Sequence, residues 1–165
     1  MKIDIIGAVG SGKTTLAKSI SEKTGIRYYE LDKIIWYTRG NIVQRYTDKE
    51  IRKKFESIIN MNEWIIESTP RDLIHDRFEY SDCVIFLDTP IFFRTIRIIL
   101  RWIKQKRGVY PCVVRPTFSF LVKNLRWSFK FEINKKKFMY DLKKHKNVII
   151  LKNNQTAVVN YLNND

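Results

Sequence analysis

Residues 7–14 read GAVGSGKT and follow directly after the apolar run KIDII at residues 2–6. They match the pattern G-x-x-x-x-G-K-[ST] through Gly7, Gly12, Lys13 and Thr14. The chain then continues with a helical period over residues 13–24. In such a strand–loop–helix unit, glycines let successive backbone N–H groups point inward with the helix N-terminus behind them. The stretch therefore predicts a loop that holds phosphate groups.

This loop indicates ATP and Mg²⁺ as cofactors. The Lys13 ammonium is expected to reach the β- and γ-phosphates, and the Thr14 hydroxyl is expected to ligate Mg²⁺. The other residues expected to surround the nucleotide are Gly7, Ala8, Val9, Gly10, Ser11, Gly12 and Thr15. A glycine-rich helix start without a ligand is the alternative, but the flanking strand and helix favour nucleotide binding.

Five β-rich runs alternate with segments of helical period, which predicts an α/β fold. The runs are 2–6, 26–31, 64–67, 83–88 and 147–151, and the expected helices are 13–24, 47–61, 71–79, 91–106, 117–140 and 155–163. Several runs are almost wholly apolar, as in parallel strands covered on both faces. We therefore expect a single domain over residues 1–165, with a five-stranded parallel sheet and helices on both faces in three layers.

Three acidic residues stand at or just after the ends of these runs: Asp32, Glu67 and Asp88. Ligands of open α/β sheets bind beyond the carboxyl ends of the strands. A phosphotransferase needs a carboxylate near its Mg²⁺ and can use another to take a proton from the acceptor. Asp32 is the candidate for the acceptor, while Asp32 and Asp88 could instead cap the helices that follow them.

The positive charge is concentrated in one part of the chain. Residues 1–90 carry 14 Lys/Arg and 14 Asp/Glu, whereas residues 91–146 carry 16 and 2. Such a segment indicates an anionic partner: polyphosphate, nucleic acid or an acidic membrane surface. A merely solvated basic surface is the alternative.

Within the basic segment, four cations recur at helical spacing: Arg94, Arg97, Arg101 and Lys104. On a helix they form one stripe whose like charges repel each other unless an anion lies against them. An opposing apolar face is expected from Phe93, Ile96, Ile99, Leu100 and Ile103. Residues 105–117, which contain Gly108, Pro111 and Pro116, read as an irregular connection.

Other signals are weak or absent in the sequence. No run of 18 apolar residues is present, and the N-terminal residues lack a signal-peptide pattern. Cys83 and Cys112 show no metal-ligand spacing, and Cys83 lies in an apolar run where a reduced thiol is expected. These features favour a cytoplasmic protein.

The segments IIESTPR (65–71) and LDTP (87–90) followed by RIILR (97–101) resemble the nucleoside monophosphate kinases, adenylate kinase above all. The resemblance implies that Glu67 holds Mg²⁺ through water and that Arg71 binds the acceptor phosphate. It also implies that Arg97 and Arg101 stack on adenine and grip phosphates at the start of a LID-like segment, about 104–117. A short acceptor-side insertion is expected at about 33–62.

More of the chain resembles the bacterial DNA topology modulation proteins, which are thought to be adenylate-kinase-like. The shared motifs are the phosphate loop, TGIRYYELDKIIW (24–36), WII (64–66), VIFLD (84–88), an arginine-rich helix and FLVKNLRWSFKF (120–131). One departure is Glu67-Ser68, where both families usually have Asp-Gly. Losing that glycine removes room for close backbone approach, which argues against an ordinary nucleotide acceptor.

The sequence thus favours a Mg²⁺-ATP-dependent phosphotransferase with a small acceptor, in which Lys13, Asp32, Arg97 and Arg101 take part in catalysis. The alternative is a nucleotide-dependent nucleic-acid-binding protein, supported by basic residues interleaved with Phe118, Phe120, Trp127 and Phe129. The spacing of Phe118, Leu121, Val122, Leu125 and Phe129 predicts packing of this helix against the sheet instead. A membrane-surface role for the same helix is a third option.

Overall fold

The computed structural model describes residues 1–39, 42–70, 77–110, 115–145 and 147–152. Five strands form one parallel sheet in the order β2-β5-β1-β6-β7. Their bounds are β1 Lys2–Gly7, β2 Tyr28–Glu30, β5 Trp64–Ser68, β6 Cys83–Leu87 and β7 Val148–Leu151. The five-stranded parallel sheet predicted from the apolar runs is confirmed.

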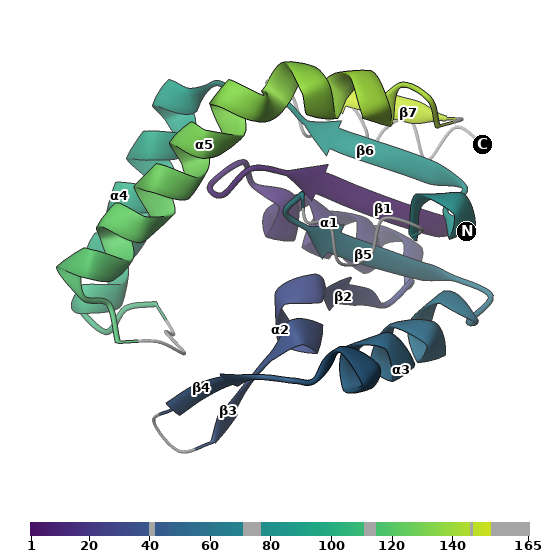
Figure 1. Ribbon diagram of the computed structural model, residues 1–165, viewed down its shortest axis with the longest axis horizontal. Coiled ribbons are helices and arrows are strands. Elements are labelled where there is room, and N and C mark those ends of the chain that lie inside the picture. The colour runs from purple at the N-terminus through teal and green to yellow at the C-terminus, as the bar shows by residue number, and fades with distance from the viewer. Residues whose placement is uncertain (40–41, 71–76, 111–114, 146, 153–165) are drawn as a thin grey trace.

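Helices cover both faces of this sheet (Figure 1). On one face, helix α1 (Lys13–Thr24) packs Leu16 and Ile20 against Ile3 and Ile5 of β1. On the other face, the C-terminal part of α5 (Phe118–Leu142) packs with Ile6, Val84 and Phe86, and α3 (Asp48–Ile59) packs with Trp64 and Ile66. Strands buried on both sides explain why the sequence runs are continuously apolar rather than alternating.

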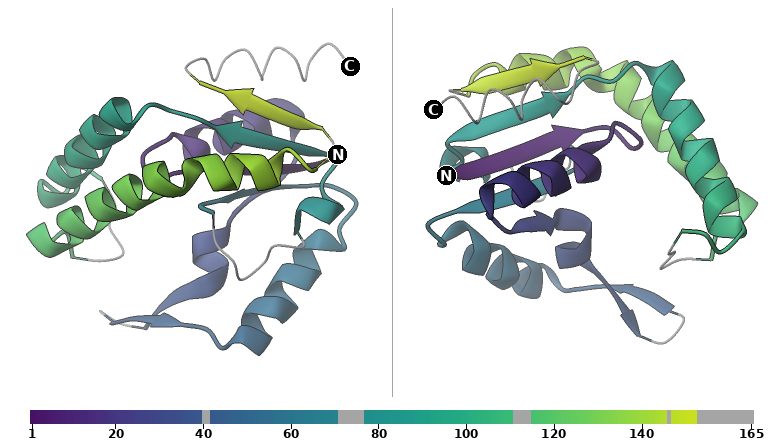
Figure 2. Two further views of the ribbon diagram at one scale, coloured as in Figure 1. Left: turned by 45° about the horizontal axis from the view of Figure 1, so that its top comes forward. Right: turned by 180° about the vertical axis from the view of Figure 1, so that it is seen from behind.

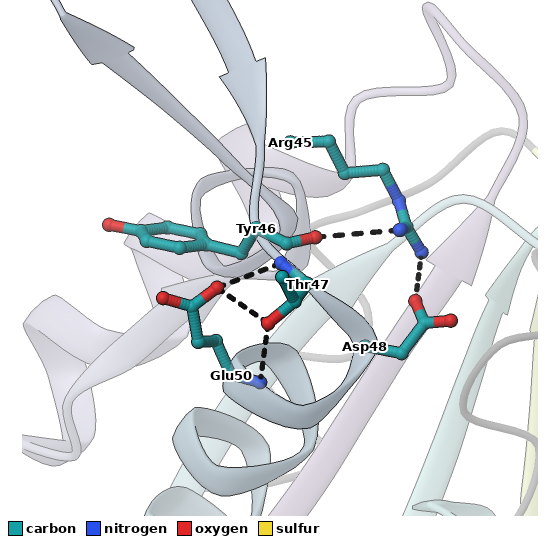
Figure 3. A network of polar contacts seen from close by, with 5 residues as sticks. All are labelled: Arg45, Tyr46, Thr47, Asp48 and Glu50. Atoms are coloured by element: carbon teal, nitrogen blue, oxygen red, sulfur yellow. Dashed lines mark hydrogen bonds and ion pairs between the residues drawn. The ribbon is translucent and has the colours of Figure 1, made fainter.

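The segment between β2 and β5 contains more regular structure than the sequence predicted. A short helix α2 (Leu31–Ile35) leads into an antiparallel hairpin, β3 (Trp36–Arg39) and β4 (Ile42–Arg45). The hairpin is fixed to α3 by polar contacts (Figure 3). Thr47 and Glu50 form a capping box, and Arg45 pairs with Asp48 at 2.6 Å. These contacts set the position of the hairpin at the start of α3.

Helix α4 (Ile91–Lys106) and the N-terminal half of α5 run beside each other and extend beyond the sheet, on the side to which β1 and β6 point (Figures 1 and 2). The prediction that the N-terminal part of α5 packs on the sheet is therefore wrong. Leu121 is buried, but Phe118 and Phe129 are exposed. The residues of α5 that join the sheet core come later: Phe131, Phe138, Met139 and Leu142.

The arrangement of α4 also differs from the expected one. Arg94 is buried together with Ile98, whereas Phe93, Ile96, Ile99 and Leu100 are exposed. The predicted apolar face exists, yet it does not face the protein core. The reason is that the opposite side of the helix packs on α5 and on the phosphate loop.

Some predicted features lie outside the described residues. They are the expected helix at 155–163, most of the one at 71–79, and four residues of the LID-like segment (111–114). Of the 71–79 segment, Arg77, Phe78 and Glu79 are described and begin a short 3₁₀ turn. Among the described residues, no helix has the length and apolar character needed to cross a membrane.

Candidate active site

The glycine-rich loop connects β1 to α1 at the carboxyl edge of the sheet. Gly12 occupies the N-cap position of α1 with a left-handed backbone, φ 99° and ψ 15°. No side chain caps this helix, and its first turn contains no acidic residue. The N–H groups at the start of α1 and the positive end of its helix dipole therefore lie where an anion can bind.

Two other glycines allow close packing around the loop. A Cβ atom at Gly7 would lie 2.8 Å from Ser11 Oγ and 3.0 Å from the carbonyl oxygen of Leu87. A Cβ atom at Gly10, whose φ is +79°, would lie 2.8 Å from the carbonyl oxygen of Arg94. Gly10 therefore lets helix α4 approach the loop directly, so α4 lies against one side of the glycine-rich loop.

Two cationic side chains reach the carbonyl oxygens of the loop. Lys13 Nζ donates to the oxygen of Ala8 at 2.9 Å and is buried. Arg97 Nη1 donates to the oxygens of Ser11 at 3.0 Å and Gly10 at 3.5 Å. The structure thus brings Lys13 and Arg97, 84 residues apart in the sequence, to the same short loop.

Glu67 connects the loop to the central strand β5. Thr14 Oγ1 donates a hydrogen bond to Glu67 Oε1 at 3.1 Å. Glu67 is buried, and burial is the main cause that raises the pKa of its carboxyl group, while Lys13 acts in the opposite direction. Glu30 and Asp32 raise the same pKa, so both carboxylates lie within electrostatic range of Glu67.

Glu30 is a residue that the sequence analysis missed. It is paired in register with Glu67 across β2 and β5, and its Oε1 accepts from Lys33 Nζ at 2.7 Å. Its position at the carboxyl end of the second strand was a usable signal, because the rule that selected Asp32 also applies to Glu30.

Asp32 itself lies in the first turn of α2 and is exposed. The alternative that it is the N-cap of this helix is wrong, since Glu30 occupies that position.

Other predicted residues are distributed differently. Arg101 lies one turn beyond Arg97 on α4 and is half-buried, while Arg71 lies outside the described residues. Asp88 pairs with Lys135 of α5 at 2.5 Å, and the N-cap of α4 is Pro90. Arg94 forms an ion pair with Glu132, so it belongs to the α4–α5 contact and not to a stripe that faces phosphate.

Thr89 is a further residue without a sequence prediction. It is buried, and its Oγ1 donates to the carbonyl oxygen of Ser11 at 3.0 Å. The bond ties the loop to the end of β6. A threonine directly after a strand gave no pattern that could single it out.

Comparisons with known proteins agree with this geometry at the level of the fold. Neither models of protein families nor curated protein sequences match the chain. Among solved structures it is similar to a sugar kinase from Janibacter sp. HTCC2649, with TM-score 0.54, 19% identity, and coverage of 98% of this chain and 91% of that one. It is also similar to deoxyadenosine kinase from M. mycoides with bound dATP, with TM-score 0.53, 16% identity and coverage of 99% and 98%.

A third similar structure is shikimate kinase from Aquifex aeolicus, with TM-score 0.50, 16% identity and coverage of 98% and 93%. These structures span nearly the whole chain, so the protein has the fold of the P-loop kinases, the class that the phosphate loop and the sheet indicated. The comparisons support a P-loop kinase fold and do not confirm the DNA topology modulation family.

Proposed function

We propose that the protein is an ATP-dependent phosphotransferase that acts on a small acceptor. The observation that carries the proposal is the connection between the phosphate loop and Glu67 through the Thr14 hydroxyl. In a simple anion-binding loop a buried carboxylate beside the phosphate site would oppose binding. Beside a nucleotide with its metal ion, the same carboxylate can bind a water molecule that the metal ion coordinates.

The chemistry of these residues fits Mg²⁺. This ion prefers hard oxygen ligands and keeps several waters, so it is usually held by one or two protein groups together with substrate phosphates. Thr14 would supply a direct hydroxyl ligand, and Glu67 would bind a coordinated water. No group of three acidic, histidine or cysteine residues that could hold a metal occurs among the described residues, which agrees with an ion bound largely by the nucleotide. When bound, it would neutralise charge between the phosphates.

The cations would exchange their present partners for phosphate oxygens. Lys13 Nζ and Arg97 Nη1 donate to loop carbonyls, and both lie where a bound polyphosphate offers stronger, charged acceptors. Arg101 is placed on the same helix, one turn further along. We propose that Lys13 and Arg97 stabilise the charge on the transferred group, with Arg101 as an additional contact.

Asp32 is the proposed base for the acceptor. In the transfer, an acceptor hydroxyl attacks the γ-phosphorus, the bond from phosphorus to the ADP oxygen breaks, and the hydroxyl proton passes to the Asp32 carboxylate. The position of Asp32 supports this role, because it follows β2 at the carboxyl edge, where ligands of open α/β sheets bind. The similar sugar, deoxyadenosine and shikimate kinases support a small hydroxyl compound as the acceptor class.

The test compares ATP hydrolysis by Asp32→Asn, Glu67→Gln and Glu63→Gln, each with ATP affinity measured by calorimetry. Glu63 is exposed and lies directly before β5, at the end opposite Glu67, so it is a matched control. We expect Asp32→Asn and Glu67→Gln to lower turnover by on the order of 100-fold with ATP affinity nearly retained. Parental turnover in both variants would remove the basis for the carboxylate roles.

Nucleic-acid binding is a second candidate, because α5 exposes Trp127 and Phe129. Exposed aromatic rings beside basic residues can stack on bases while the cations contact phosphates. Lys123 already lies over the Trp127 ring, 4.9 Å from its centroid. The carboxylates around Thr14 have no part in such binding, so we place this candidate second.

A further inference from the structure

Helix α4 presents a continuous apolar stripe to solvent. The stripe consists of Phe92, Phe93, Ile96, Ile99 and Leu100, with exposed fractions from 37% for Ile99 to 67% for Phe92. Their spacing of one, three and four residues puts them on one face of the helix. Ile103 continues the same face and is half-buried. This apolar stripe is unlike the scattered single apolar residues that are common on protein surfaces.

The stripe lies on the side of α4 that faces away from the protein. Ile98 and Arg94, on the opposite side, are buried. Gly10 packs against both, and α5 runs along the helix (Figure 2). In both views α4 is at an outer edge of the molecule (Figures 1 and 2). A large or flat partner can therefore reach the stripe without displacing the phosphate loop.

The residues around the stripe restrict the chemistry of that partner. Between Asp88 and Glu132 the sequence has no acidic residue. Of the cations on α4 and its C-cap, Arg94 is buried against Glu132 and Arg97 contacts the phosphate loop, which leaves Arg101, Lys104, Lys106 and Arg107 for a partner. A second copy of the chain, paired through this stripe, would place like charges next to each other, which is destabilising. Nucleic acid would leave Ile96, Ile99 and Leu100 without suitable contacts, because aliphatic side chains do not stack on bases as aromatic rings do.

We propose that α4 is a membrane-surface helix that docks on anionic lipid bilayers. A helix with Phe, Leu and Ile on one face and Lys and Arg on the other lies in the plane of the lipid interface, with its apolar face among the acyl chains. Lys104, Lys106 and Arg107 would contact the anionic headgroups. Helix α4 docks along its length without crossing the bilayer, and the phosphate loop stays on its protein side.

The experiment measures binding of the full chain to vesicles by flotation. Vesicles of phosphatidylcholine with phosphatidylglycerol are compared with vesicles of phosphatidylcholine alone. The test variant is Ile96→Gln with Leu100→Gln, both exposed, and the control is Ile133→Gln on α5, which is also exposed. None of these residues contacts the phosphate loop in the described structure, so ATP binding should be unchanged in all variants and serves as the check on folding.

We expect binding to the anionic vesicles only, with at least about a tenfold loss in Ile96→Gln/Leu100→Gln and none in Ile133→Gln. A second variant, Lys104→Gln with Lys106→Gln, should weaken binding and reduce its salt dependence. Equal binding by the test and control variants would overturn the proposal, as would no binding at all. A dimer in gel filtration that only Ile96→Gln/Leu100→Gln converts to a monomer would assign the stripe to a second copy instead.

Discussion

Residues 1–90 carry 14 basic and 14 acidic residues, whereas residues 91–146 carry 16 basic and 2 acidic residues. The first region also buries its apolar side chains around the sheet, while the second leaves Phe92, Phe129 and Ile133 exposed. The first region balances its charges internally, and its larger apolar clusters lie in the sheet core. The second region carries a large excess of positive charge beside exposed apolar side chains, which indicates contacts with an anionic partner.

Two buried arginines show the difference at the level of single residues. Arg77 and Arg94 are each 1% exposed. Arg77 Nε pairs at 2.7 Å with Asp4 Oδ2, which is completely buried in β1. Arg94 pairs with Glu132, whose side chain is 37% exposed, and its Nη1 also donates to the oxygen of Ser128 at 3.4 Å. Both partners of the first pair are buried in the core, whereas the Glu132 side chain of the second pair is accessible to water.

The largest expected effect comes from breaking the buried pair. Asp4→Ala leaves the Arg77 charge buried without its partner, and we expect a loss of about 3–5 kcal/mol in the free energy of unfolding. Glu132→Ala should cost only about 1–2 kcal/mol, because Glu132 is 37% exposed and water can take its place beside the Arg94 guanidinium. Urea denaturation of both variants measures the difference. Equal losses would show that the two regions do not differ in this way.

The same pair predicts a pH dependence. Burial raises the pKa of Asp4 to about 6, although Arg77 acts to lower it. Because the folded state then binds a proton more readily than the unfolded state, stability should fall as pH rises from about 4 to about 6, by up to roughly 3 kcal/mol from this group. Other carboxylates titrate in the same range, so the measurement is the difference between the parent and Asp4→Asn. A constant difference from pH 4 to 7 would contradict the raised pKa.

Within the phosphate loop, the expected effect is on binding and not on stability. Lys13→Ala removes the proposed donor to the β- and γ-phosphates and should weaken ATP·Mg²⁺ binding by on the order of 100-fold. Lys18→Ala is the matched control, since Lys18 lies on the same helix, is exposed and pairs only weakly with Glu22 at 3.7 Å. Calorimetric titration of folded variants decides the matter. Undiminished affinity in Lys13→Ala would remove the nucleotide assignment.

The central sheet and the loop could be predicted because their signals are local. GAVGSGKT needs only its own glycines and the flanking strand and helix, and the apolar strands need only burial on both faces. The hairpin β3–β4 was missed, since its four-residue strands are mostly exposed and carry no apolar alternation. The contact of Arg97 with the loop was consistent with the sequence, but its partners, Gly10 and Ser11, depend on the tertiary packing of α4.

The burial of α4 could not be predicted for a related reason. Helical periodicity shows which residues share a face, but it does not say which face meets the protein. The rule that apolar faces are buried would have selected Ile96 and Leu100, and the structure buries Arg94 and Ile98 instead. Arg94 can be buried because Glu132 and the Ser128 carbonyl lie within reach on α5.

A smaller effect is expected when the cations of the second region are compared with each other. Arg97→Ala removes the residue that touches the loop, and we expect about tenfold weaker ATP·Mg²⁺ binding. Lys136→Gln with Lys137→Gln removes two exposed charges from α5 and should leave ATP affinity unchanged. Lys135 is kept in this control because it pairs with Asp88. Equal effects in the two variants would mean that the basic region acts through its total charge alone.

The smallest effect of substitutions is expected on DNA binding, and this measurement tests the nucleic-acid candidate directly. A protein with net charge +14 binds any polyanion at low salt, since each phosphate contact releases counterions. In a mobility-shift series we expect weak DNA binding at low salt that disappears at physiological salt and does not depend on ATP·Mg²⁺. In Lys136→Gln/Lys137→Gln, the DNA affinity should fall less steeply with salt concentration. Trp127→Ala should change it little, because non-specific binding depends on phosphates and not on stacking. Tight binding at physiological salt that requires ATP and is lost in Trp127→Ala would make α5 a nucleic-acid site, and the second region would then have a specific polymeric partner.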